Sequence, residues 1–150
     1  MNMCEWCAYK ENEWLLYKSF PVNVALIRAT YCDEDGNATM EKEAATLDSL
    51  SIAQAAKNSG GIVLLQVEKV VKNGTLDPRM VKIPGIYVDG IVVSRPENHW
   101  QTYAGQYNPA LCGEVKVPVD SIPPMALNER KVICRRAAQE LDPAAIINLG

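Results

Sequence analysis

The sequence predicts an α/β fold in which helices flank a mostly parallel sheet, and three observations predict it. Residues 47–59 carry small apolar side chains at helical spacing. Gly60 and Gly61 follow directly, and glycine accepts the left-handed backbone conformation that commonly ends a helix. Two nearly continuous apolar runs then occupy residues 62–67 and 86–93, which is the pattern of parallel strands buried on both faces.

The helix before the glycine pair has a recognisable start and a narrow apolar face. Thr46 or Asp48 can serve as its N-cap, because a short side-chain oxygen satisfies amide donors that the first turn leaves unpaired. The face suited to lying on a sheet consists of Ile52, Ala53, Ala55 and Ala56. Glycine pairs also occur in phosphate-binding loops, but those loops precede a helix and this pair follows one.

Two aromatic-rich runs near the N-terminus predict a β-hairpin. They cover residues 3–9 and 13–18, on either side of a turn at residues 10–12. Their aromatic side chains could stack on a ligand or pack across the strands, and we favour packing, the commoner use in a hairpin. These side chains are Trp6, Tyr9, Trp14 and Tyr17.

The five cysteines do not form a convincing metal or redox motif. Cys4 and Cys7 make a C-x-x-C pair, but no second pair or nearby histidine completes a zinc set. We interpret the pair as part of the hairpin arm. The remaining cysteines are expected to be small, buried or half-buried side chains, and the odd number argues against a secreted disulfide framework.

Residues 22–30 are predicted to form a central strand that leads into an acidic turn at residues 33–37. The spacing of the acidic residues superficially resembles a calcium loop. An EF-hand needs a bidentate glutamate at its twelfth position, and Ala44 stands there when counting from Asp33. We therefore interpret the segment as a glycine-asparagine turn at a strand end, followed by an irregular stretch at residues 38–45.

The polarity changes at residues 96–124, where prolines recur and no hydrophobic periodicity survives. We interpret this stretch as a linker that wraps a surface and has little regular structure of its own. It contains His99, the only histidine of the chain. Because no carboxylate or serine motif surrounds His99, we expect no catalytic role for it.

A second helix is predicted over residues 129–141, with Asn128 as its N-cap. Its basic residues could bind a phosphate, but the flanking glutamates favour a solvated face. An apolar strand is predicted to begin at residues 144–149. A new helix and strand after a linker are typical of the opening of a second domain.

Composition limits the classes of partner. The net charge of −3 argues against a nucleic-acid surface, which usually needs a basic patch. No apolar run approaches the roughly 20 residues that span a bilayer, and the N-terminus lacks the blocks of a signal peptide. We expect a cytoplasmic protein that binds neither nucleic acid nor membrane.

Seven segments together resemble the acetate/propionate CoA-transferase branch of the family I CoA-transferases, which are 3-oxoacid CoA-transferase-like. The segments are residues 15–18 (LLYK), 24–30 (VALIRAT), 33–37 (DEDGN), 54–63 (QAAKNSGGIV), 66–71 (QVEKVV), 74–79 (GTLDPR) and 83–89 (IPGIYVD). Residues 128–137 and 148–150 resemble the start of the second half of that family. The resemblance covers nearly the whole chain in the family's order.

The resemblance implies a partial Rossmann-like fold of the NagB/RpiA/CoA-transferase-like type, as an internal fragment across the junction of two similar halves. Residues 1–95 would form the C-terminal part of the first half, residues 96–127 the linker, and residues 128–150 the start of the second half. Asn148 and Gly150 match the beginning of an Asn-x-Gly-x-Gly turn near the active-site cleft. They are the expected substrate-binding residues.

The implied activity moves CoA from an acyl-CoA, such as acetyl-CoA or propionyl-CoA, to a carboxylic acid through a glutamyl-CoA thioester. No glutamate of this chain matches the catalytic one, and Glu68 is expected to close a structural hydrogen bond or ion pair. We therefore expect no catalytic residue or metal ligand in this chain, and no activity of the chain alone. CoA thioesters are implied as substrates, with no further cofactor, and the family is commonly homo-oligomeric.

Two other interpretations stay open. One is a non-catalytic binding or assembly module that keeps the CoA-transferase scaffold and has lost the chemistry. The other is a split-subunit enzyme with active-site parts on a partner. The second is less favoured, because split subunits of the family divide at the linker and this chain crosses it.

Overall fold

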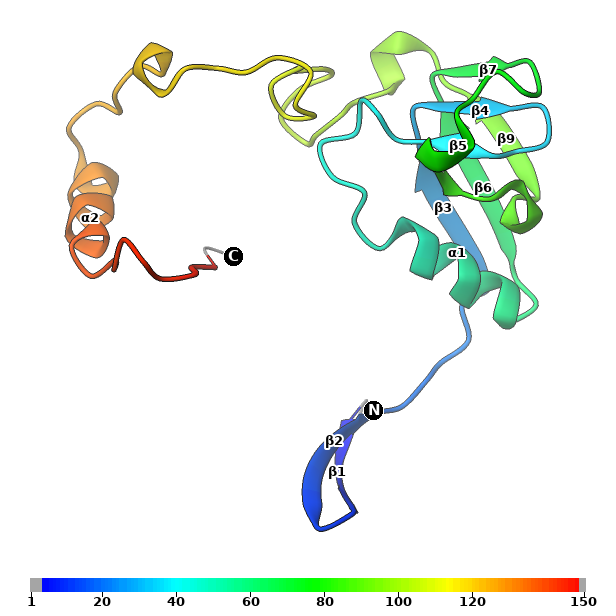
Figure 1. Cartoon of the computed structure of the whole chain (residues 1–150), viewed down its shortest axis with the longest axis horizontal. Coiled ribbons are helices and arrows are strands. Elements are labelled where there is room, and N and C mark those ends of the chain that lie inside the picture. Colours follow the sequence, from blue (N-terminus) through cyan, green and yellow to red (C-terminus); the bar gives the residue numbers. More distant parts are fainter. Residues whose placement is uncertain (1–3, 149–150) are drawn as a thin grey trace. The chain divides into compact units, whose positions relative to one another are not determined.

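The computed structural model describes residues 4–148 and divides into two compact units, one up to Val115 and one from Lys116 onward. The first unit holds all the strands and the helix α1 (Ser49–Asn58). The second unit holds the helix α2 (Glu129–Ala138) (Figure 1). Within residues 4–148 there are also four short 3-10 helices: η1 (Pro78–Met80), η2 (Gly85–Tyr87), η3 (Pro96–Asn98) and η4 (Val119–Ser121).

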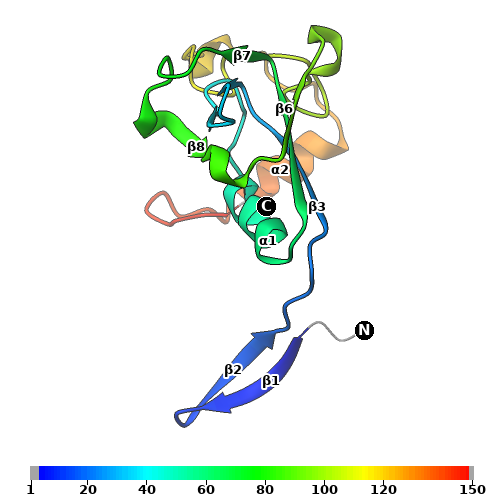
Figure 2. The ribbon, with the colours of Figure 1, turned by 90° about the vertical axis from the view of Figure 1, so that its right-hand side faces the viewer.

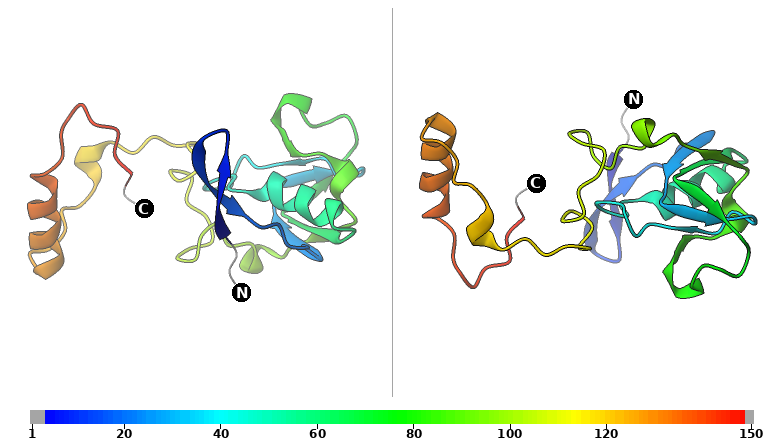
Figure 3. Two further views of the ribbon diagram at one scale, coloured as in Figure 1. Left: turned by 90° about the horizontal axis from the view of Figure 1, so that it is seen from below. Right: turned by 90° about the horizontal axis from the view of Figure 1, so that it is seen from above.

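The main sheet is parallel, as the sequence predicts. It consists of β3 (Val24–Arg28), β6 (Ile62–Val67) and β9 (Gly90–Val93), in the order β3-β6-β9. The helix α1 follows β5, precedes β6 and contacts both β3 and β6 (Figure 1). Figure 3 shows this helix, in teal, from below and from above. Two expectations need correction: β6 is the central strand and β3 an edge strand, and η2 replaces the start of the strand predicted over residues 86–93.

A second, four-stranded sheet was not expected. Its strands are β4 (Tyr31–Asp33), β5 (Ala38–Thr39), β7 (Lys69–Val71) and β8 (Val81–Ile83), in the order β7-β4-β5-β8. The strand β5 lies in a segment predicted to be irregular. Because β4 follows β3 after two residues and β7 follows β6 after Glu68, two strands of the main sheet pass almost directly into the second sheet.

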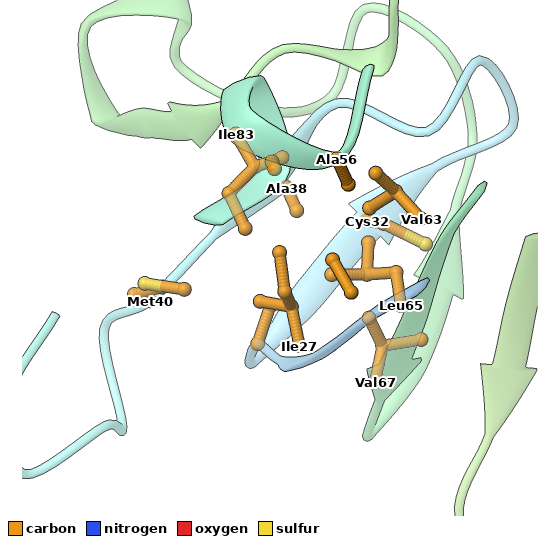
Figure 4. Packing of buried hydrophobic residues seen from close by; sticks show 12 residues of the cluster. Ile27, Cys32, Ala38, Met40, Ala56, Val63, Leu65, Val67 and Ile83 are labelled. Carbon is orange, nitrogen blue, oxygen red and sulfur yellow. The ribbon is translucent and has the colours of Figure 1, made fainter. Parts of the chain in front are cut away.

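The core lies where α1 and the two sheets meet (Figure 4). Ala53 and Ala56 of α1 are fully buried, because the small alanine side chain allows close approach of helix and strands. Ile52, predicted on the same face, is exposed. The other buried apolar side chains are Ala25, Ile27, Ala29, Cys32, Ala38, Met40, Val63, Leu65, Val67 and Ile83.

The opposite face of the main sheet is open among the described residues. Successive strand side chains point to opposite faces, and burial alternates along β3 and β6 accordingly. On the open face Leu26 is 76% exposed, and Val92 is also exposed. The expected burial on both faces is therefore absent from the described part of the chain, because α1 covers one face only.

The ends of α1 differ in how well they follow the prediction. Asp48 occupies the N-cap position but makes no capping hydrogen bond with its side chain. Instead the Ser49 hydroxyl donates to the Thr46 carbonyl over 2.8 Å. At the other end Gly60 has a φ of +72°, so the predicted glycine stop is confirmed.

The N-terminal hairpin is confirmed and consists of β1 (Cys4–Tyr9) and β2 (Asn12–Tyr17) (Figure 2). Trp6 lies opposite Leu15 and Trp14 opposite Cys7, so the predicted aromatic packing does not pair aromatic side chains directly. These aromatic residues stay exposed. Residue 3 of the predicted strand lies outside the described residues.

The two cysteines of the C-x-x-C motif are both free thiols. They lie three positions apart on β1, so their side chains point to opposite faces of the strand. This geometry does not suit a shared metal or a disulfide. Between residues 4 and 148, no group of three or more metal-ligating side chains is found.

In the second unit, the Asn128 side chain accepts a hydrogen bond from the Lys131 amide over 2.9 Å, which confirms the predicted cap of α2. The strand predicted at residues 144–149 is wrong for the part that is described, residues 144–148. A turn occurs there, in which the Asp142 carboxylate accepts from the Ala144 amide. No helix within residues 4–148 has the length and apolar character needed to cross a membrane.

Candidate functional site

A cavity of about 210 Å³ lies at the carboxyl ends of the three parallel strands. Arg28 ends β3, Glu68 follows β6, and Pro96 lies three residues after β9. Ligands of open α/β sheets bind outside the carboxyl ends of the strands, so this is where the fold favours a site. The lining residues are Arg28, Lys42, Glu68, Pro96, His99, Gln106 and Tyr107.

Arg28 links the strand β3 to the linker. Its Nε donates to Nε2 of His99 over 3.3 Å, and its terminal nitrogen lies 3.3 Å from Oε1 of Glu43. A guanidinium can only donate, so Nε2 of His99 accepts and the neutral ring carries its proton on Nδ1. Burial and the Arg28 charge lower the pKa of His99, which agrees with a neutral ring.

Glu43 is the buried partner of Arg28, with its side chain only 9% exposed. Burial raises the pKa of this carboxyl, and the Arg28 charge opposes that rise. Glu43 does not line the cavity. It therefore holds the guanidinium in place from outside the space that a ligand would occupy.

Lys42 and Glu68 form the second ion pair of the site. The Lys42 ammonium lies 2.9 Å and 3.0 Å from the two carboxylate oxygens of Glu68. The ammonium also lies over the rings of Tyr31 and Tyr107, at 5.5 Å and 5.6 Å from their centroids. The hydrogen bond that Lys42 donates to Glu68 is the main cause that raises the pKa of Lys42. The structural ion pair expected of Glu68 is present.

The first part of the linker closes the cavity. The buried Gln101 donates from its side-chain amide to the Lys42 carbonyl over 2.7 Å and accepts from the Asn108 amide over 2.8 Å. The hydroxyl of Tyr107 donates to Glu114, and this contact raises the pKa of Tyr107. The linker has little regular structure, as predicted, yet its first part packs on the first unit.

The residues predicted from the sequence have different places. Asn148 is exposed and follows α2 in the second unit, whereas Gly150 lies outside the described residues. Their role as substrate-binding residues stays a prediction, as does the division at residues 95 and 127. His99, for which no catalytic role is expected, lines the cavity beside Arg28.

The sequence analysis missed Arg28 and Lys42 as site residues. A signal for Arg28 was available, because it is the charged residue near the carboxyl end of an apolar strand, where α/β folds place their ligands. No such signal exists for Lys42, which comes from an irregular segment and reaches the site only through the fold.

The comparisons with known proteins agree with this fold. The family model described as Coenzyme A transferase matches residues 8–94. Caffeate CoA-transferase of Acetobacterium woodii is 47% identical over 150 residues, 99% of this chain and 29% of the relative. Acetate CoA-transferase YdiF of Escherichia coli K12 is 42% identical over 143 residues, 95% of this chain and 27% of YdiF.

A solved structure extends the likeness to three dimensions. The apoenzyme of the acyl-CoA transferase YdiF from Escherichia coli O157:H7 matches with a TM-score of 0.78 and 40% identity, over 94% of this chain and 26% of that one. This chain thus spans 27% to 29% of the length of the two curated relatives. The family match covers more than half of the chain, in the segments that carry the resemblance. The chain therefore belongs to the coenzyme A transferase family.

Proposed function

We propose that this chain is part of a CoA-transferase that moves CoA between a short-chain acyl-CoA, such as acetyl-CoA or propionyl-CoA, and a carboxylic acid. The observation that carries the proposal is the 40% identity and TM-score of 0.78 with the acyl-CoA transferase YdiF over nearly the whole chain. The reaction would proceed through a glutamyl-CoA thioester, because a carboxylate nucleophile divides one difficult exchange into easier steps. It would serve cytoplasmic short-chain fatty acid and ketone body metabolism.

We infer that the contribution of this chain to such an enzyme is structural, because the resemblance implies that no residue of this chain is the catalytic glutamate of the family. The strands β3 and β6 end at Arg28 and beside Glu68, and two ion pairs join these two residues to Glu43 and Lys42 of the segment before α1. The linker is held at the same edge by the hydrogen bonds from Arg28 to His99 and from Gln101 to the Lys42 carbonyl. We propose that this arrangement sets the position of the first part of the linker.

A chimera tests the proposal. The 143-residue segment of Escherichia coli YdiF that matches this chain is replaced by the matching residues of this chain. We expect the chimera to convert acetyl-CoA and propionate into propionyl-CoA at a rate within about tenfold of YdiF, a loss of at most about 1.4 kcal/mol in barrier height. The product is followed by chromatography. The 150-residue chain alone is expected to show no transfer.

The control is the same chimera with Gly61→Ala. A Cβ atom at this position would lie 2.4 Å from the Asn23 carbonyl oxygen, so backbone must move and the start of β6 is displaced. Transfer should then fall. A well-folded chimera that binds CoA but makes no propionyl-CoA would count against the proposal, as would a preference for caffeate over propionate.

The alternative, a non-catalytic binding or assembly module, is supported by the open apolar face of the main sheet and by the exposed aromatic hairpin. The same chimera separates the two functions, because a module would assemble with the rest of YdiF without restoring turnover. We also propose that the enzyme is a homo-oligomer, which light scattering of the purified protein would test.

A further inference from the structure

Asn73 and Gly74 form the only asparagine–glycine pair of the chain, and they lie in an exposed turn between β7 and η1. A backbone hydrogen bond closes this turn, because the Thr75 amide donates to the Lys72 carbonyl over 3.1 Å. An asparagine side chain can react with the backbone nitrogen of the next residue, since ring closure between them gives a succinimide. Glycine favours this reaction, because it has no Cβ atom to hinder the approach of the nitrogen.

The two reacting groups of this turn are not held by other hydrogen bonds. Neither the Gly74 amide nor the side-chain NH2 group of Asn73 donates a hydrogen bond within residues 4–148. A Cβ atom on Gly74 would have no heavy atom within 4 Å, apart from the neighbouring residues, so water can reach the peptide bond from that side. The side-chain oxygen of Asn73 accepts from the Asp35 amide over 3.2 Å. This donor polarises the side-chain carbonyl and makes its carbon easier to attack.

We propose that Asn73 is a site of spontaneous deamidation in the folded protein. The Gly74 nitrogen loses its proton to hydroxide and attacks the side-chain carbon of Asn73. The bond from that carbon to the NH2 group breaks, and ammonia leaves with a proton from the solvent. Water then adds to one of the two succinimide carbonyl carbons, and the ring opens to aspartate or isoaspartate. The net reaction consumes water and releases ammonia, without oxidation or reduction.

This modification goes beyond the proposed transfer reaction, because it needs neither CoA nor an active site. Asn73 ties the acidic turn at residues 33–37 to the segment after β7. Its side chain accepts from the Asp35 amide, and its own amide donates to the Glu34 carboxylate over 3.3 Å. Aspartate keeps an acceptor for the Asp35 amide. Isoaspartate adds a methylene group to the main chain, so both contacts should be lost and the acidic turn should loosen.

Asn58 is the matched comparison within the chain. It is also exposed, and a small residue, Ser59, follows it. The Ser59 amide, however, donates to the carbonyls of Ala55 and Ala56, each over 3.1 Å. The end of α1 must therefore unravel before this nitrogen can attack, whereas the turn at Asn73 opens when its backbone hydrogen bond breaks. The fold should thus protect Asn58 and leave Asn73 reactive.

The test compares both sites in the folded and the unfolded chain. The 150-residue chain is incubated at pH 7.5 in water enriched in oxygen-18, with and without urea, and is then digested with trypsin. Trypsin cleaves after Lys72 and Arg79 and so releases residues 73–79, whose gain of oxygen-18 is measured by mass spectrometry. Without urea, Asn73 should react at a rate within about tenfold of its rate in urea. Asn58 should be slowed about thirtyfold or more, because two hydrogen bonds of its neighbour must break.

The pH and the products identify the attacking group. Lowering the pH by one unit should slow the reaction at Asn73 about tenfold, because less of the Gly74 nitrogen is deprotonated. Chromatography of the peptide should give both aspartate and isoaspartate, since water can open the succinimide at either carbonyl. Aspartate without isoaspartate would mean direct hydrolysis of the side chain and would overturn the proposed attack by Gly74.

Three variants of Asn73 separate the modification from the loss of a contact. Asn73→Gln cannot form the succinimide, so its peptide should gain no oxygen-18. Asn73→Asp keeps an acceptor and should leave the hydrogen exchange of the Asp35 amide as slow as in the parent chain. Asn73→Ala removes the acceptor and should speed this exchange about fivefold or more.

Two further results would overturn the proposal. One is a peptide of residues 73–79 that gains oxygen-18 in urea but not in the folded chain, because the turn would then protect Asn73. The other is an equal effect of folding on the rates at Asn58 and Asn73, because the free Gly74 amide would then make no difference. No CoA is present in these measurements, so their outcome does not depend on whether the chimera with YdiF turns over.

Discussion

Gly85 joins two parts of the first unit that are far apart in the sequence, and replacing it tests how the fold holds them together. Its amide donates to the Asn37 side-chain oxygen over 2.9 Å. The Asn37 amide group and backbone in turn donate to the Asp33 carboxylate over 2.9 Å and 2.8 Å. A Cβ atom on Gly85 would lie 2.0 Å from the Asp35 carbonyl oxygen. The acidic turn therefore fits only against a glycine.

The cost of Gly85→Ala follows from these distances. Ordinary contact begins at 3.4 Å, so the turn and the glycine must separate by about 1.4 Å. That movement breaks the hydrogen bond to Asn37, worth about 1 kcal/mol, and adds about 1–3 kcal/mol of overpacking. The free energy of unfolding should fall by about 2–4 kcal/mol. The melting temperature should then fall by about 10–20 °C.

The measurement is thermal unfolding followed by far-UV circular dichroism, with Gly105→Ala as the matched control. Gly105 has no heavy atom within 4 Å of the position of an added Cβ, so this variant should melt like the parent chain. Equal melting temperatures for Gly85→Ala and Gly105→Ala would refute the reasoning. Such a result would mean that the turn at residues 33–37 does not pack against Gly85 in solution.

Three further predictions use other parts of the first unit. The pKa of His99 is lower in the folded chain than its unfolded value of 6.5. Its contribution to stability is therefore fully present above pH 6.5 and is lost as the pH falls below that value. The raised pKa of Glu43 has the opposite effect, because it lowers the stability as the pH rises above about 4.5. The contribution of His99 to the stability is therefore measured as the difference in urea midpoint between the parent chain and His99→Gln. Leu65→Ala, in the core, should lower the unfolding free energy by about 2–5 kcal/mol. Leu26→Ala, on the open face, should leave the unfolding free energy nearly unchanged and should reduce aggregation. Equal losses of unfolding free energy in the two variants would contradict the burial pattern. Burial raises the pKa of the Cys32 thiol to about 11, so it should react with a thiol reagent at pH 8 only after unfolding, and reaction as fast as that of the exposed cysteines would contradict its place in the core.

Local signals in the sequence were sufficient for several elements. The glycine stop at Gly60, the apolar run of β6 and the hairpin turn at Lys10 each depend on neighbours in the sequence. The backbone at Lys10 and Glu11 has positive φ values of 49° and 65°, as the tight turn of a two-residue hairpin loop requires. Such features need no knowledge of the rest of the fold.

Other elements depend on partners that lie far along the chain. The strands β5 and β8 are two and three residues long, too short for any periodicity to reveal them, and they exist because each pairs with the other. The apolar residues 144–147 resemble a strand, but no strand forms there and a turn occurs at residues 143–145 instead. Pairing across the sheet decides these cases, and a sequence pattern does not contain it.

The candidate site shows the same dependence on distant contacts, and Thr30 explains how it is met. This fully buried residue lies in the bend between β3 and β4. Its carbonyl accepts from the Glu68 amide over 2.9 Å, and its hydroxyl accepts from the Lys42 amide over 3.0 Å. One residue thus fixes the backbone of both members of the ion pair, two positions after Arg28. The chain bends at Thr30 between β3 and β4 and at Glu68 between β6 and β7, where it passes from one sheet into the other. These two bends therefore also bring the charged groups of the cavity together.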